Sequence, residues 1–69
     1  MIKINKIEQF QLFCLENYKF SKGISGEIAL GYFKQYQVFE YISESYDVLH
    51  TQSKIFIVSD INDFIERRL

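Results

Sequence analysis

The side chains best suited to chemistry in this chain are His50, its one histidine, and Cys14, its one cysteine. Asp47 lies one helical turn before His50, so its carboxylate can orient the imidazole as a general base. A working site also needs a nucleophile tied to such a pair, and the sequence shows none. We therefore expect His50 to make a hydrogen bond at the C-terminal end of a helix, where its protonated form also suits the helix dipole.

The sequence supports a metal site or a phosphate-binding site as weakly as it supports a catalytic histidine. A zinc site needs three or four ligands at workable spacing, and one histidine with one cysteine supplies too few. Gly23 and Gly26 lie at the start of a predicted helix, whose backbone amides can bind an anion, but no P-loop Lys-Ser/Thr pair follows them. Cys14 falls on the apolar stripe of a predicted helix, where a free thiol packs as a small hydrophobe. We expect no enzymatic activity, cofactor or metal.

The composition indicates a small protein that binds another protein. The chain has 69 residues, of which 48% are hydrophobic and 17% aromatic. A chain of this length forms one domain, here residues 1–69, and buries only roughly 60% of its extended-chain surface. That leaves more apolar surface than a small monomer can hide, and large exposed apolar patches usually mark interaction sites. We expect a partner, either another protein or a second copy of the chain.

The charge distribution and the length of the apolar runs limit which partners and which cell compartment the protein can have. The net charge is −1 and the basic residues are scattered, apart from Arg67 and Arg68, whereas a nucleic-acid binder shows a basic patch. The apolar runs fall far short of the roughly 20 residues that span a bilayer, and the N-terminus lacks the apolar block of a signal peptide. A single cysteine allows no internal disulfide and fits a reducing compartment. We therefore expect a cytoplasmic protein that binds neither nucleic acid nor membrane.

Two helices are predicted in the first half of the chain. Asn5, with Glu8 three residues later, forms a capping-box pattern for a helix at about residues 5–20. Gly23 suits the left-handed conformation that often ends a helix. Ser25 then caps a second helix, which runs as far as the central stretch of the chain.

That central stretch, residues 36–52, predicts one helix. At about 100° per residue, its apolar side chains cover about half of the circumference, so the helix contacts more than one neighbour. Its other side carries three carboxylates, which repel DNA and suit a basic protein surface. Tyrosine is enriched at binding hot spots, so tyrosines beside this face are expected anchors. The expected partner-binding residues are Glu40, Tyr41, Glu44, Tyr46, Asp47 and His50.

The segment after the central helix predicts a β-strand. Residues 54–58, KIFIV, are apolar and β-branched, as in a short strand with both faces covered. A strand must pair, here with residues 1–4, with the turn at 51–53, or with another chain across a two-fold axis. A last helix then begins at a cap formed by Ser59 or Asp60.

The fold class that follows is mostly α with a minor β part, a compact bundle of about four helices with a short strand or hairpin near 54–58. The alternative is a winged helix-turn-helix, with helices at 25–36 and 39–50 as the DNA-binding pair and 51–58 as the wing. The acidic exposed side of the 39–50 helix argues against that alternative, although the spacing permits it.

Nearly the whole chain resembles an uncharacterised family of short bacterial proteins, a domain of unknown function. The residues that carry the resemblance are FCLENY at 13–18, KGISGEIAL at 22–30, VFEYISESYDVLHTQ at 38–52 and DINDFI at 60–65. The resemblance implies a small partner encoded beside toxins, some of them related to ADP-ribosyltransferases. It therefore implies an antitoxin or immunity role, and it brings no catalytic residues with it.

Overall fold

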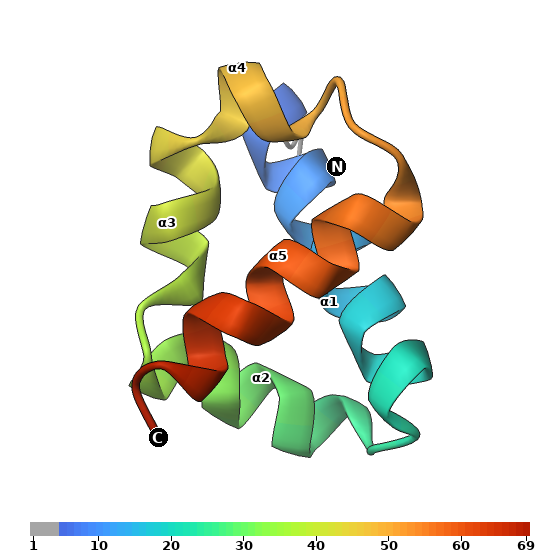
Figure 1. Cartoon of the computed structure of the whole chain (residues 1–69), viewed down its shortest axis with the longest axis vertical. Helices are drawn as coiled ribbons and strands as arrows, with labels where there is room; N and C mark the ends of the chain where they lie inside the picture. Colours follow the sequence, from blue (N-terminus) through green and yellow to red (C-terminus); the bar gives the residue numbers. More distant parts are fainter. Residues whose placement is uncertain (1–4) are drawn as a thin grey trace.

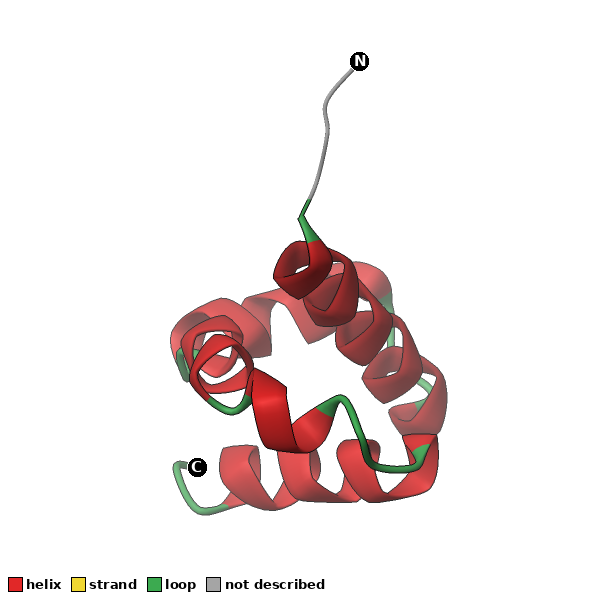
Figure 2. Ribbon diagram, turned by 90° about the horizontal axis from the view of Figure 1, so that it is seen from above, coloured by secondary structure: helices red, strands yellow, loops and turns green. Residues whose placement is uncertain are grey.

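In the computed structural model, which describes residues 5–69, helices form nearly all of the chain. The long helix α5 crosses the front of the molecule, with α1 behind it, α2 below it and α3 beside it (Figure 1). Seen from above, the helices enclose a common core (Figure 2). Their bounds are α1 Lys6–Lys22, α2 Gly26–Gln35, α3 Val38–Glu44, α4 Tyr46–Leu49 and α5 Lys54–Glu66.

The first two helices begin and end where the sequence predicts. The Asn5 carboxamide oxygen accepts the backbone N–H of Glu8 at 2.8 Å, and the Glu8 carboxylate accepts the backbone N–H of Asn5 at 3.1 Å. Gly23 ends α1 with φ 65°, the left-handed conformation that glycine adopts without steric cost. The Ser25 hydroxyl accepts the Ile28 N–H at 3.2 Å. These caps satisfy backbone groups that a helix end leaves free.

The central helix is wrong as a single element, because the chain turns at Ser45 between α3 and α4. The chain also enters α3 through Gln37, which has φ 57°. The turn at Ser45 sets α4 across the end of α3 (Figure 1), and it brings the Tyr46 ring edge-on to Phe10 of α1 at 5.5 Å. As expected from its wide apolar side, α3 contacts more than one neighbour, namely α1, α2 and α5.

The predicted strand at 54–58 is also wrong, and so are the cap at Ser59 or Asp60 and the wing at 51–58. Ser53 caps α5 by accepting the Phe56 N–H at 3.2 Å. The buried positions then recur every four residues, as a helix requires, at Ile57, Ile61 and Ile65.

The β-branched residues at 54–58 are helical in spite of their β-propensity, because that propensity depends on packing within a sheet. The described residues, 5–69, contain no strand with which it could pair. The short strand expected at residues 1–4 lies outside the described range. The fold is therefore a compact, wholly helical bundle over the described residues.

Each of the four longer helices contributes side chains to one core. Tyr18 of α1 lies against Phe33 of α2 with 5.6 Å between ring centroids, and Phe33 also meets Phe39 of α3 edge-on at 5.3 Å. Within residues 5–69, no helix is both long enough and apolar enough to cross a membrane. The buried cluster consists of Cys14, Tyr18, Ala29, Phe33, Val38, Ile42, Ile57, Ile61 and Ile65.

Candidate functional site

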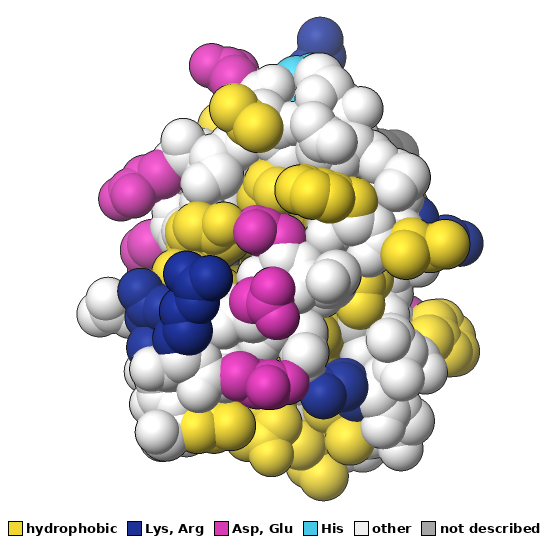
Figure 3. Space-filling view, viewed as in Figure 1, with side chains coloured by type: hydrophobic (Ala, Val, Ile, Leu, Met, Phe, Trp, Pro, Cys, Tyr) yellow, Lys and Arg dark blue, Asp and Glu magenta, His cyan; other side chains and the backbone are white. Residues whose placement is uncertain are grey.

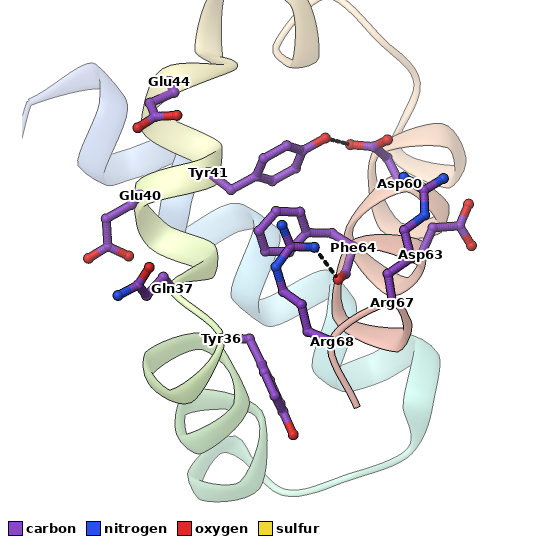
Figure 4. Close-up of a pocket in the computed structure, with 10 residues that line it drawn as sticks. All are labelled: Tyr36, Gln37, Glu40, Tyr41, Glu44, Asp60, Asp63, Phe64, Arg67 and Arg68. Carbon is purple, nitrogen blue, oxygen red and sulfur yellow. Dashed lines mark hydrogen bonds between the residues drawn. The ribbon is translucent and has the colours of Figure 1, made fainter.

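A cleft of about 440 Å³ lies between α3 and the C-terminal half of α5 (Figure 4). Aromatic side chains contribute to its walls, and carboxylates outnumber guanidinium groups around it. We call it the α3–α5 cleft. Its lining residues are Tyr36, Gln37, Glu40, Tyr41, Glu44, Asp60, Asp63, Phe64, Arg67 and Arg68.

Tyr41 joins the two walls of the cleft. Its hydroxyl donates a hydrogen bond to the Asp60 carboxylate at 2.5 Å, and its ring stacks on Phe64 with centroids 4.1 Å apart. Burial raises the pKa of Tyr41 to about 12, and the hydrogen bond to Asp60 and its negative charge add to the shift. Tyr41 therefore stays protonated at neutral pH, and its hydrogen bond and ring stack fix it between the two walls.

The Arg68 side chain is held against the Phe64 ring. Its guanidinium carbon lies 3.6 Å from the Phe64 ring centroid, within the range of a cation–π contact. One of its N–H groups also donates to the Phe64 carbonyl oxygen at 3.0 Å. Figure 4 shows this guanidinium folded back toward its own helix. Arg68 is thus occupied by its own helix and is poorly placed to neutralise the carboxylates opposite.

Among residues 5–69, three carboxylates of the cleft have no described ion pair, although Arg67 and Arg68 line the same cleft. Within residues 5–69 the described ion pair joins Lys19 to Glu16 at 3.0 Å, on another part of the surface. The negative side chains along α3 and α4 follow one side of the molecule, next to a small basic patch (Figure 3). Unpaired carboxylates beside rigid aromatic rings favour a cationic group as ligand. The carboxylates concerned are Glu40, Glu44 and Asp63.

The structure divides the expected partner-binding residues into two groups. Glu40, Tyr41 and Glu44 lie on α3 and line the α3–α5 cleft. The others, from Tyr46 to His50, belong to α4 and the turn after it and lie outside the cleft. The turn at Ser45 causes the separation, because it interrupts the single helix in which the prediction placed all six.

His50 makes the hydrogen bond expected of it. Its Nδ1 lies 2.6 Å from the carbonyl oxygen of Tyr46, at the end of α4. A carbonyl oxygen only accepts, so Nδ1 carries the proton. The imidazole also stacks on the Tyr46 ring with centroids 4.4 Å apart and planes within 4°. Tyr46 and His50 are therefore held together as a pair, and Nδ1 is engaged by backbone and not by Asp47.

The α5 wall of the cleft is not among the binding residues expected from the sequence. Asp60, Asp63 and Arg67 follow one another at helical spacing and all line it. That periodicity was present in the sequence. The predicted last helix, which begins at Ser59 or Asp60, already contains Asp63 and Arg67, but the expected binding residues were all taken from the central helix.

The remaining reactive group lies far from solvent. Cys14 is fully buried in the core, and burial raises the pKa of its thiol from 9.0 to about 12. A thiol so protonated is a poor nucleophile and a poor metal ligand. In the part of the chain from residue 5 onward, no group of three or more His, Cys, Asp or Glu side chains is placed to hold a metal ion.

Comparison with known proteins identifies the family. Residues 9–68 match a family described as protein of unknown function, DUF3791. The chain belongs to this family. The matched residues of the DUF3791 protein include both walls of the α3–α5 cleft. No significant match exists among curated proteins or among solved structures.

Proposed function

We propose that this DUF3791 protein is a non-enzymatic binding module that masks a basic surface of another protein. The observation that carries the proposal is the set of unpaired carboxylates, Glu40, Glu44 and Asp63, beside the fixed Tyr41 ring. A basic side chain of the partner would enter the cleft between the two walls. Charge complementarity of this kind speeds the encounter and rejects wrong partners.

The rigid floor of the cleft suits a binding role. Tyr41 and Phe64 are stacked, and the Tyr41 hydroxyl is already bonded to Asp60. Anchors that are fixed before binding lose little side-chain entropy when a partner arrives. A guanidinium or ammonium group of the partner beside Glu40 and Glu44 would gain charge contacts, while Tyr41 and Arg68 already cover the Phe64 ring.

Exposed apolar side chains support association with a protein. The expected surplus of apolar surface is seen, because several large side chains remain open to solvent. Val48 on α4 is 65% exposed and lies one residue after the carboxylate of Asp47. Single exposed apolar residues are ordinary, but this many on 69 residues favours an interface. The exposed set is Leu12, Phe13, Phe20, Ile28, Val48, Ile55, Phe56 and Leu69.

Within this proposal the protein acts as an antitoxin or immunity-type partner in the cytoplasm. The resemblance noted in the sequence implies a toxin as the masked protein, with ADP-ribosyltransferase-like toxins as one class. A single buried thiol and no second cysteine fit a reducing compartment. The negative wall of the cleft would cover a basic groove and would need no catalytic group of its own.

The test begins with affinity capture from an extract of the native host. Wild-type protein is compared with the double variant Glu40→Lys/Glu44→Lys, and the retained proteins are identified by mass spectrometry. The matched control, Glu16→Lys/Glu27→Lys, changes net charge equally at exposed carboxylates outside the cleft. We expect one protein to be retained by wild type and control and lost from the cleft variant.

Equal retention by all three forms would remove the cleft from the proposal. Retention of DNA fragments in place of a protein would instead favour the nucleic-acid alternative, although residues 54–58 of its expected wing are helical. Residues 54–58 are helical, so a homo-oligomer cannot form by pairing strands at these residues.

A further inference from the structure

A second hollow of the surface lies between the C-terminal part of α1 and the first two turns of α5. Its volume is about 660 Å³, and it is separate from the α3–α5 cleft, with which it shares no residue. We call it the α1–α5 groove. Its lining residues are Asn17, Phe20, Ser21, Lys22, Lys54, Ile55, Val58, Ser59 and Asn62.

The groove holds two of the most exposed apolar side chains described in the protein. Phe20 is 73% exposed and Ile55 is 82% exposed. Figure 3 shows apolar side chains gathered along the edge of the molecule where α1 ends and α5 begins. Ile55 belongs to the run that the sequence assigned to a covered strand, so its apolar character is not explained by the protein's own core. Surface of this kind usually marks an interaction site.

The charges around the groove have one sign. Lys22 and Lys54 line it, and no carboxylate does. Lys54 is also at an unfavourable place for its own helix, since the first turn of α5 has the positive end of the helix dipole and contains no acidic residue. By contrast, Glu8 and Glu27 occupy the first turns of α1 and α2. Lys54 therefore slightly destabilises α5 through the dipole, and an anionic ligand in the groove would offset that cost.

We propose that the α1–α5 groove binds an amphipathic helix with acidic flanks from a partner protein. A groove between two packed helices accepts a third helix by interlocking side chains. Extended peptides bind instead by adding to a sheet edge, and residues 5–69 offer no sheet. Apolar side chains of the guest contact Phe20 and Ile55, and its carboxylates face Lys22 and Lys54.

A second copy of the chain is a poorer fit for the groove. A second copy would have to offer an exposed apolar helix face flanked by carboxylates. The residue that comes nearest to this is Leu12 of α1, which is 49% exposed and lies between Glu8 and Glu16. A guest helix needs apolar side chains on successive turns, at i, i+3, i+4 and i+7. The buried sides of α3 and α5 are already covered by the protein's own core.

The experiment uses two designed helical peptides that carry leucine at the same i, i+3, i+4 and i+7 positions. One has glutamate flanks and the other has lysine flanks. Binding to the whole protein is followed by fluorescence anisotropy, and the contact surface is located by chemical-shift changes in ¹H–¹⁵N spectra. We expect the glutamate peptide to bind more tightly, with shifts concentrated at Phe20, Ile55 and Val58.

Variants distinguish specific binding in the groove from nonspecific hydrophobic binding elsewhere on the surface. Phe20→Ser or Ile55→Ser should each weaken binding about tenfold, equivalent to about 1.4 kcal/mol. Val48→Ser removes an apolar side chain of similar exposure that lies outside the groove, and it should leave binding unchanged. Reversal of both groove charges, Lys22→Glu/Lys54→Glu, should transfer the preference to the lysine peptide, an outcome that misfolding would not produce.

The proposal is overturned if neither peptide binds, if both bind equally, or if the shifts map to α3 and α4. It is also overturned if light scattering shows a dimer that Ile55→Ser dissociates, because a second copy then occupies the groove. These outcomes are distinct from failure of the α3–α5 cleft, since the variants share no residue with it.

Discussion

The Tyr41 hydroxyl donates a hydrogen bond to the Asp60 carboxylate across the gap between α3 and α5, with 2.5 Å between the oxygens. The same ring stacks on Phe64, one turn further along α5. α3 is a short helix, and short helices depend on tertiary packing for stability. This contact therefore fixes the acidic wall of the α3–α5 cleft relative to the opposite wall.

Removal of that hydroxyl should destabilise the protein. Tyr41→Phe keeps the ring stack and loses the hydrogen bond, so the free energy of unfolding should fall by about 1 kcal/mol or more, and Tm by about 4–8 °C for each kcal/mol. Thermal unfolding followed by circular dichroism measures the change. Tyr46→Phe is the matched control, since its ring contacts Phe10 and His50 without a described hydroxyl bond. Equal losses in both variants would contradict a special role for the Asp60 contact.

Stability should decrease at alkaline pH. The pKa values of Cys14 and Tyr41 are each raised to about 12, from 9.0 and 10.0 respectively, chiefly by burial. The unfolded chain therefore loses these protons first. Their contribution is fully present below about pH 9 and is lost as pH rises toward 12.

Urea unfolding at a series of pH values measures this decrease. Tyr41→Phe should flatten the part of the decline that lies above the usual tyrosine pKa of 10.0, and Cys14→Ala should flatten the part that begins near 9.0. Unchanged slopes in both variants would mean that other groups cause the alkaline loss.

Two glycines should respond in opposite directions to alanine. Gly31 lies within α2, and a methyl group added there would meet no atom within 4 Å, so Gly31→Ala should stabilise the protein by about 0.5–1 kcal/mol. Gly23 has φ +65°, so Gly23→Ala should destabilise it by about 1–2 kcal/mol. Denaturant titration of the pair decides the matter. A loss of stability in Gly31→Ala would mean that this position is needed by something outside the described chain.

The positive charge of Lys54 in the first turn of α5 should slightly lower the free energy of unfolding. Lys54→Glu places a favourable charge in the first turn of α5 and should raise the free energy of unfolding by about 0.3–1 kcal/mol, while it weakens binding of the glutamate peptide. Lys34→Glu is the counterpart at the last turn of α2 and should lower stability by a similar amount. Salt should reduce both effects. If Lys54→Glu is destabilising, Lys54 makes a local contribution that the dipole argument omits.

Local signals near helix ends were predicted correctly from the sequence. The Asn5 capping box, the Gly23 terminator and the Ser25 cap each depend on a few adjacent residues, so the sequence contains what is needed to predict them. The burial of Cys14 and the hydrogen bond of His50 also followed from helical position.

Features that depend on distant contacts were not predictable in this way. The turn at Ser45 is explained by Phe10 and Phe64, which lie on other helices and contact Tyr46 and Tyr41. Residues 54–58 have strand-like composition, and helix is favoured by the Ser53 cap, by the core contacts of Ile57 and by the absence of a pairing strand in residues 5–69. The α5 wall of the cleft was not predicted because its position beside α3 depends on tertiary contacts, such as the stack of Tyr41 on Phe64.

The most direct measurement of the central claim is the association rate of the captured partner with this DUF3791 protein at increasing salt. We expect the wild-type rate to fall steeply with ionic strength, and Glu40→Lys/Glu44→Lys to associate more slowly with a much weaker salt dependence. If the cleft variant associates at the wild-type rate with the same salt dependence, the α3–α5 cleft is not the surface that meets the partner.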